Sequence, residues 1–429
     1  MRDAARLVVV AVVALYAHGA HSEPLPLVPV SPALYGNVFT TFQANTPLRR
    51  PQGDKQHRYP FYQYVDLSAA SPEHNLSINT FLRGREIGNG DDASFDVYNA
   101  NLDYRSTNQK VQVRVGRQIL TEGLNYTLMD GGLARYRPAD GTELVSYAGY
   151  QDVDLQPQPD RHAKSFAIFG TKVRTSRMLG SVVSLGYEGT SASNFSARHF
   201  LTASFNRVVP YTDFADFYSR LELDIAQANP SFLNAGVGIS AAKPLYVNLE
   251  YDTYKPDKDR DEFLQDLIFE VFSVSRLHEA RLGMTYYATT FLQVSTSYSF
   301  ATYDMNSGES ANGNIWKLGF TWDFWRRLGL RGFNGLYLIE GRGRDQAIGA
   351  NCGLSEEILR GLELHVEFAY ANFQSISSKD GNAYSYIAGT QYMVARNLAA
   401  RAEVELNTNP DFRRDVRGNF GISYYFSRS

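Results

Sequence analysis

The sequence predicts an all-β protein: a transmembrane, antiparallel, up-and-down β-barrel of about 22 strands (18–22 as the range), with one helical extracellular loop. Three observations predict this fold. Many short segments alternate apolar and polar residues, the N-terminus has an export signal, and the last strand is aromatic. Successive side chains of a strand point to opposite faces, so each such strand has an apolar face for lipid and a polar face for water.

The segment 362–370 shows the alternation most clearly. Leu364, Val366 and their apolar neighbours share one face, whereas Glu363, His365 and Glu367 share the other. A soluble sheet can show this pattern too. Here, however, the pattern recurs along almost the whole chain, and the apolar faces are rich in Tyr, Phe and Trp, as lipid and its interfaces require.

Alternation and turn residues together predict the strand positions. An even number of strands is typical of single-chain bacterial barrels, and a closed barrel leaves no backbone group unpaired in hydrocarbon. The predicted strands are 35–45, 61–70, 76–87, 94–107, 110–121, 131–138, 142–153, 165–176, 180–190, 199–209, 214–228, 232–242, 245–255, 277–289, 291–304, 313–325, 328–341, 345–358, 362–375, 382–395, 398–410 and 416–427.

Composition excludes several classes of protein. The mean hydropathy of −0.32 argues against a helical membrane protein, and the net charge of −3 gives no electrostatic reason to expect nucleic acid as a partner. Cys352 is the only cysteine, so disulfides, Cys-pair metal sites and covalent c-type haem attachment are excluded within this chain. We therefore expect no cofactor and no metal.

The N-terminus is typical of a secretory signal. Arg2 and Arg6 precede and flank an apolar run to Ala17, which is too short to span a bilayer, and small residues follow it. An N-terminal membrane anchor is the alternative. The predicted organisation is a signal peptide at 1–22, a Pro-rich segment at 23–34 and an outer-membrane barrel at 35–429.

The C-terminal segment Phe420–Phe426 alternates and is aromatic, the type of last strand that the barrel-assembly machinery engages, although three residues follow it. Connection lengths predict the orientation, because short turns face the periplasm and long loops face outward. The short connections are 289–290, 326–328, 395–397 and 242–244, and the long ones are 46–60, 121–130, 256–276, 305–312 and 376–381.

One region resembles a known family. The stretches "VQVRVGRQIL", "MDGGLARYRP" (which we expect to begin in a loop) and "TELVSYAGYQDVD" look like the first half of alginate-export-type outer-membrane barrels. The stretches "LSINTFLRGR" and "YKPDKDRDEFLQDLIFEVFSVSRLHEARLGMTYY" are similar to barrels of metal-reducing bacteria. The resemblance implies a porin-like barrel and leaves the solute open. Alginate exporters have an arginine-rich lumen, whereas this chain also places many acids there.

The polar strand faces carry the residues that would line the lumen and set selectivity. Basic residues dominate the early strands, and acidic residues dominate the later ones, so we expect a charge separation across the lumen. The alternative is that these charges only form cross-strand ion pairs. The candidates are Arg83, Arg85, Arg105, Arg114, Arg135, Arg137, Glu222, Asp224, Glu250, Asp252, Glu279, Asp323, Glu363, His365, Glu367, Glu403 and Glu405.

The connection 256–276 is the candidate for narrowing the lumen. Apolar residues from Phe263 to Phe272 recur at helical spacing, which predicts an amphipathic helix that folds inward or packs on the outer rim. Its acidic face would carry Asp259, Asp261, Glu262, Asp266 and Glu270.

The absence of a plug domain and of a nucleophile–His–acid set leaves a channel as the first hypothesis, and we expect no enzyme. It would let small hydrophilic or ionic solutes diffuse passively across the bacterial outer membrane. The alternatives are a sheath that holds a separate multihaem cytochrome, and an exporter or importer of a specific polymer or oxyanion. Outer-membrane lipid and lipopolysaccharide are the expected surroundings, and the basic loop 48–60 could contact lipopolysaccharide phosphates.

Overall fold

The protein was analysed as a computed structural model. It describes residues 33–45, 60–87, 94–123, 127–152, 166–178, 181–192, 195–208, 214–226, 228–254, 277–304, 310–325, 330–341, 346–374, 381–408 and 415–428. The predicted signal peptide at 1–22 and most of the Pro-rich segment at 23–34 lie outside these residues, so both stay predictions.

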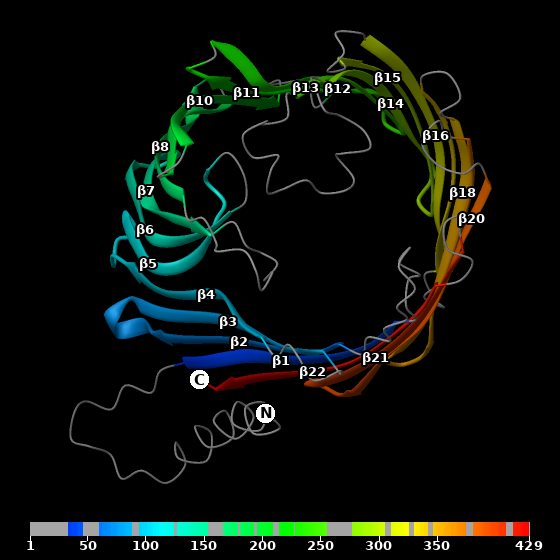
Figure 1. The fold of residues 1–429 in the computed structure, drawn as a ribbon, viewed down its shortest axis with the longest axis horizontal. Coiled ribbons are helices and arrows are strands. Elements are labelled where there is room, and N and C mark those ends of the chain that lie inside the picture. Colours follow the sequence, from blue (N-terminus) through cyan, green and yellow to red (C-terminus); the bar gives the residue numbers. More distant parts are fainter. Residues whose placement is uncertain are drawn as a thin grey trace.

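The described residues form one sheet of 22 strands, which closes into a ring (Figure 1). Each strand pairs antiparallel with its neighbours in the sequence, so the colours run once around the ring. The strands are β1 Ala33–Asn45, β2 Pro60–Ser71, β3 Leu76–Ile87, β4 Ser94–Arg105, β5 Val111–Leu120, β6 Thr127–Ala139, β7 Thr142–Asp152, β8 Phe166–Met178, β9 Ser181–Ala192, β10 Phe195–Val208, β11 Ala215–Asp224, β12 Asn229–Ala242, β13 Leu245–Tyr254, β14 Leu277–Thr289, β15 Leu292–Asp304, β16 Ser310–Trp325, β17 Leu330–Glu340, β18 Gln346–Leu359, β19 Leu362–Gln374, β20 Gly381–Ala395, β21 Leu398–Thr408 and β22 Asp415–Arg428.

The first and last strands close the ring. β1 pairs with β22 in a continuous register from Leu34–Arg428 to Asn45–Arg417. A sheet edge in hydrocarbon would leave backbone N–H and C=O groups without partners, at several kcal/mol each. The predicted fold class is therefore confirmed, including the strand number.

Helix is almost absent from the described residues. A single short 3-10 turn, Pro72–His74, joins β2 to β3. No helix in the described ranges has the length and apolar character needed to cross a membrane.

Some predicted boundaries are wrong. The Asp-Gly-Gly sequence at 130–132 is typical of a turn, but β6 begins at Thr127, inside the connection predicted at 121–130. Leu128 and Met129 continue the ladder because both pair with β7. Four further ends differ by three residues or more: β10 begins at Phe195 rather than 199, β11 ends at Asp224 rather than 228, β12 begins at Asn229 rather than 232, and β16 begins at Ser310 rather than 313.

The connections predicted to be short and those predicted to be long lie on opposite rims, although the two-residue connection 193–194 lies on the rim of the long ones. The short turns 140–141, 243–244, 290–291 and 396–397 share the rim where β1 begins and β22 ends, which we call the periplasmic rim. The long connections 46–59, 153–165 and 255–276 share the opposite, outer rim. The helix predicted at 256–276, with its acidic candidates, lies outside the described residues, and so does the basic loop 48–59.

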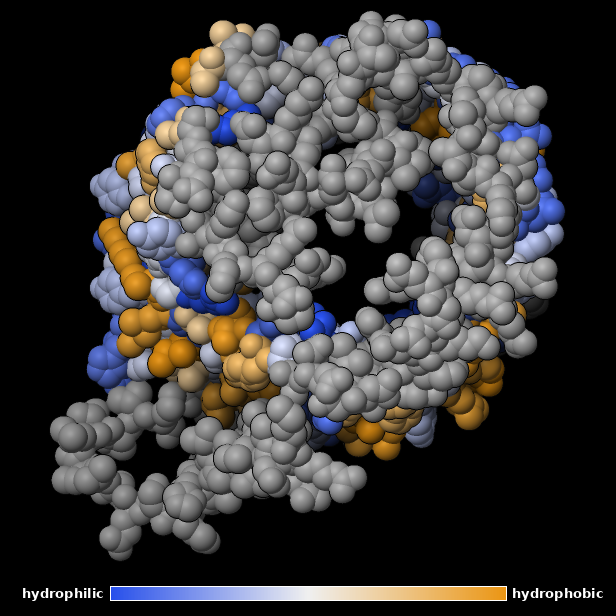
Figure 2. All heavy atoms as spheres, in the orientation of Figure 1, coloured by the Kyte–Doolittle hydropathy of each residue, from blue (hydrophilic) through white to orange (hydrophobic). Residues whose placement is uncertain are grey.

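The two faces of the sheet differ in polarity. Large apolar side chains project from the outside of the ring, where Figure 2 shows many hydrophobic residues. Val115, Leu249 and Leu336, for example, are each more than half exposed. Exposed apolar area of this extent is unfavourable in water and favourable in lipid.

Leu249→Arg tests which face meets lipid. Leu249 faces outward near the middle of β13, where a buried guanidinium costs about 2–4 kcal/mol in a bilayer. We expect the free energy of unfolding in lipid vesicles, measured by urea titration, to fall by about that amount.

The control is Ser297→Arg, because Ser297 lies one residue away in depth on the inward face of β15. We expect this variant to change the free energy of unfolding by less than about 1 kcal/mol. Equal losses for the two variants would contradict the assignment of the faces.

Candidate functional site: the lumen wall

We call the inward-facing side chains of the ring the lumen wall. The strand register puts the predicted lining residues on this one face, except that Arg137 is placed there by its contact with Glu143 and Asp323 lies in a register shift at the end of β16. On the early strands these are Arg83, Arg85, Arg105, Arg114, Arg135 and Arg137, and on the later strands Glu222, Asp224, Glu250, Asp252, Glu279, Asp323, Glu363, His365, Glu367, Glu403 and Glu405. Their role in selectivity stays a prediction.

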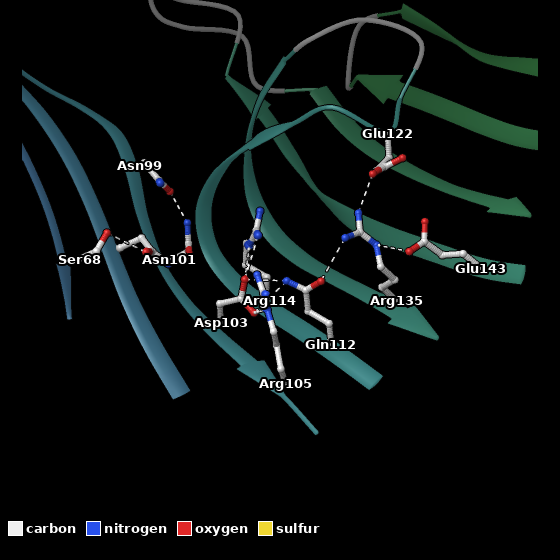
Figure 3. A network of polar contacts seen from close by, with 11 residues as sticks. Ser68, Asn99, Asn101, Asp103, Arg105, Gln112, Arg114, Glu122, Arg135 and Glu143 are labelled. Atoms are coloured by element: carbon white, nitrogen blue, oxygen red, sulfur yellow. Dashed lines mark hydrogen bonds and ion pairs between the residues drawn. The ribbon is translucent and has the colours of Figure 1, made fainter. Parts of the chain in front are cut away.

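Asp103 on β4 is the centre of a buried network on the early wall (Figure 3). Its side chain is only 3% exposed. It accepts hydrogen bonds from Gln112 Nε2 at 2.7 Å and from Arg114 Nη2 at 2.9 Å, and Arg105 Nε lies 3.6 Å away. Arg105 and Arg114 thus share one carboxylate, which offsets part of the positive charge that the sequence predicted here.

Arg135 on β6 continues the network toward β7 (Figure 3). Its Nη2 donates to Glu122 at 2.6 Å, its Nη1 donates to Gln112 at 3.1 Å, and its Nε lies 3.1 Å from Glu143. Arg137 donates to the same Glu143 at 3.0 Å. Each of these arginines therefore has a carboxylate partner.

The connection after β5 folds over the lumen wall. Glu122 contacts Arg135 and also lies 3.8 Å from Lys172 on β8, two strands farther along the ring. At Gly123 a Cβ would lie 2.6 Å from Glu188 of β9, so a larger residue here would have to displace that carboxylate. The described part of this connection, 121–123, therefore lies against the inward side of β6, β8 and β9, a contact that the sequence did not predict.

A small apolar cluster lies next to residues 121–123, on the inward side of β5–β8. Its members have almost no exposed surface, so neighbouring residues shield them from water in the lumen. Tyr147 at its edge donates a 2.6 Å hydrogen bond to Glu188. The cluster is Leu120, Met129, Leu133, Val145, Tyr147 and Ile168.

On the later wall, one arginine pairs with two acidic side chains. Arg281 of β14 donates to Glu250 at 2.8 Å and to Glu279 at 2.9 Å. Tyr218 of β11 reaches Glu250 from two strands away and donates a hydrogen bond to it. The ring can cross β12 because the position between them is Gly236, where a Cβ would overlap the ring.

Glu403 of β21 is the centre of a second group of charged side chains on this wall. It accepts from Arg401 at 2.5 Å, and His365 Nε2 lies 3.3 Å away. Arg417 lies 3.8 Å from the neighbouring Glu405. Within the described ranges no group of three or more His, Cys, Asp and Glu side chains could hold a metal ion.

The structure also shows wall acids that the sequence-based selection missed. Asp96 pairs with Arg83 through one oxygen, Oδ2, which lies 2.8 Å from Nη2 and accepts a 2.9 Å hydrogen bond from Nε. Together with Glu122, Glu143 and Glu188 it brings the early wall closer to neutrality than predicted. The early wall therefore presents ion pairs with a moderate basic excess, rather than a uniformly basic surface.

Comparison with known proteins supports the fold. No protein-family model matches the chain, and no curated protein matches it in sequence. Among solved structures it is similar to OccK11 of Pseudomonas aeruginosa (13% identity, TM-score 0.44, covering 93% of this chain and 96% of that one). It is also similar to a BenF-like porin of Pseudomonas fluorescens (12% identity, TM-score 0.47, covering 92% and 99%).

A mutant ferric enterobactin receptor, PfeA of Pseudomonas aeruginosa, superposes better, with TM-score 0.62 at 9% identity, covering 91% of this chain and 80% of that one. At such identities the likeness concerns the fold alone. The fold of this chain is a closed, antiparallel β-barrel of 22 strands. The finer resemblance to alginate-export-type barrels stays a prediction.

Asp103→Asn tests the network on the early wall. The amide keeps the shape but removes the charge that Arg105 and Arg114 share, and hydrogen bonds to charged groups contribute about 1.5–3 kcal/mol. We expect the free energy of unfolding in vesicles to fall by about that amount.

Glu367→Gln is the matched control. Glu367 is exposed on the lumen wall, and no ion pair joins it to another described residue. We expect a change within about 0.5 kcal/mol. A loss as large as that of Asp103→Asn would show that the network contributes no special stability.

Proposed function

We propose that this barrel is a channel for passive diffusion of small hydrophilic or ionic solutes across the outer membrane. One observation carries the proposal: charged and polar side chains line the inward face on both the early and the later strands, and many of these charges are paired.

Paired charges suit such a passage for a physical reason. A salt bridge on the wall offers donors and acceptors to water and solute while its net charge is small, so ions of either sign meet only a modest barrier. An apolar solute would have to displace water from these groups without replacing their hydrogen bonds, which is costly.

Conductance of the purified protein in planar bilayers tests the proposal. We expect stepwise insertion events and a steady current in potassium chloride. A barrel that inserts, as judged by protease protection, but passes no current would contradict it. A haem protein that co-purifies with such a sealed barrel would favour the alternative of a sheath around a separate multihaem cytochrome.

Removing charges from the early wall and from the later wall, in separate variants, tests their roles in ion selectivity. Glu363 and Glu367 face the lumen on β19, and Arg85 faces it on β3. In a salt gradient we expect the double variant Glu363→Gln/Glu367→Gln to shift the reversal potential toward anions, and Arg85→Gln to shift it toward cations. Shifts in the same direction, or none, would contradict a selective role for these residues.

A further inference from the structure

Four aromatic rings follow one another across β1–β4 on the lumen wall. We call Phe39, Tyr64, Phe81 and Tyr98 the aromatic strip. Successive ring centroids lie 5.8, 6.1 and 5.5 Å apart, and successive ring planes differ by 29°, 15° and 35°. The first three rings stack, the fourth is tilted against its neighbour, and all four side chains remain partly exposed.

A neutralised arginine holds one end of the strip. Arg83 lies over the rings of Tyr98 and Tyr62, with its Cζ 5.0 and 5.9 Å from the two centroids. Its ion pair with Asp96, in which Nε and Nη2 both contact Oδ2, offsets the charge. Guanidinium and rings thus fix one another, so the strip is held in place before any solute arrives.

Polar atoms without partners surround the strip. Asn37 Oδ1 and Thr41 Oγ1 lie on β1, two residues before and after Phe39. Arg85 Nε on β3 and Ser94 Oγ on β4 face each other in register just beyond Arg83. None of these four atoms has a hydrogen-bond partner among the described residues, although each is shielded from bulk water. Such groups are costly to leave unpaired, so their grouping points to a ligand.

Resting on the channel function proposed above, we propose that the aromatic strip is a saccharide-binding subsite of the lumen. A sugar ring has a flat face of C–H groups, which suits an aromatic ring face, and an edge of hydroxyls, each a donor and an acceptor. The unpaired groups include an acceptor, Asn37 Oδ1, a donor, Arg85 Nε, and two hydroxyls. A chain of sugar units, whose hydroxyls are spread along its length, offers donors and acceptors to groups spaced along the wall in this way.

An aromatic carboxylate fits the site less well. Asp96 already occupies Arg83, and a carboxylate cannot donate to Asn37 Oδ1. The spacing of about 6 Å between neighbouring rings also gives successive sugar units a ring each. Short oligosaccharides should therefore bind better than monosaccharides.

Block of the potassium chloride current by maltotriose in planar bilayers tests the inference. We expect concentration-dependent block of the full-length barrel, with Tyr64→Ala or Phe81→Ala raising the half-blocking concentration about threefold to tenfold. Tyr64→Phe, which keeps the ring, should retain the block. Phe333→Ala, which removes an inward-facing ring on β17 beside Gly353, is the matched control and should not change it.

Correct folding of each variant is checked by heat-dependent mobility on gels and by strand content in circular dichroism. A normal current that maltotriose does not block, or block that persists in both alanine variants, would overturn the saccharide subsite and leave the channel proposal standing. Stronger block by benzoate than by maltotriose would overturn it as well. Absence of current altogether contradicts the channel proposal, and the subsite with it.

Discussion

Pairing of β1 with β22 is the constraint on which the rest of this molecule depends. Without it the sheet would have two long edges, and hydrocarbon offers no partner for their backbone groups. With it, the sheet has only an outside and an inside. Strand alternation then fixes the environment of every side chain, because a shift of one residue would exchange the two faces completely.

The inward face carries many charged side chains, whereas the outward face is mainly apolar. A wall of charged side chains in a confined lumen would repel itself if the charges had one sign. Here arginines and carboxylates from neighbouring strands meet, as Asp103 meets Arg114 and Glu403 meets Arg401. The wall therefore stays polar and hydrated while its net charge stays small. The aromatic strip on β1–β4 and the apolar cluster on β5–β8 interrupt this polar lining, so the lumen is chemically asymmetric.

The sequence predicted which residues face inward, because a period of two is a property of each strand by itself. It could not predict which charges meet, since that depends on the register between strands. Asp96 shows the difference. Alternation counted back from Arg105 places Asp96 outside, but a bulge beside Tyr98 shifts the pairing of β4 with β3 and brings Asp96 inside, next to Arg83. The inward fold at Glu122 was missed for a similar reason, because its contacts with Arg135 and Lys172 come from distant strands.

The central claim is that one sheet separates lipid from water, and cysteine accessibility along β19 tests it most directly. The native Cys352 faces outward and is replaced first, by Cys352→Ser. Single cysteines are then placed at 363 to 368 in turn and exposed to a charged, membrane-impermeant thiol reagent in lipid vesicles. The account predicts reaction at 363, 365 and 367 and protection at 364, 366 and 368. Uniform reaction, or uniform protection, along the strand would contradict it.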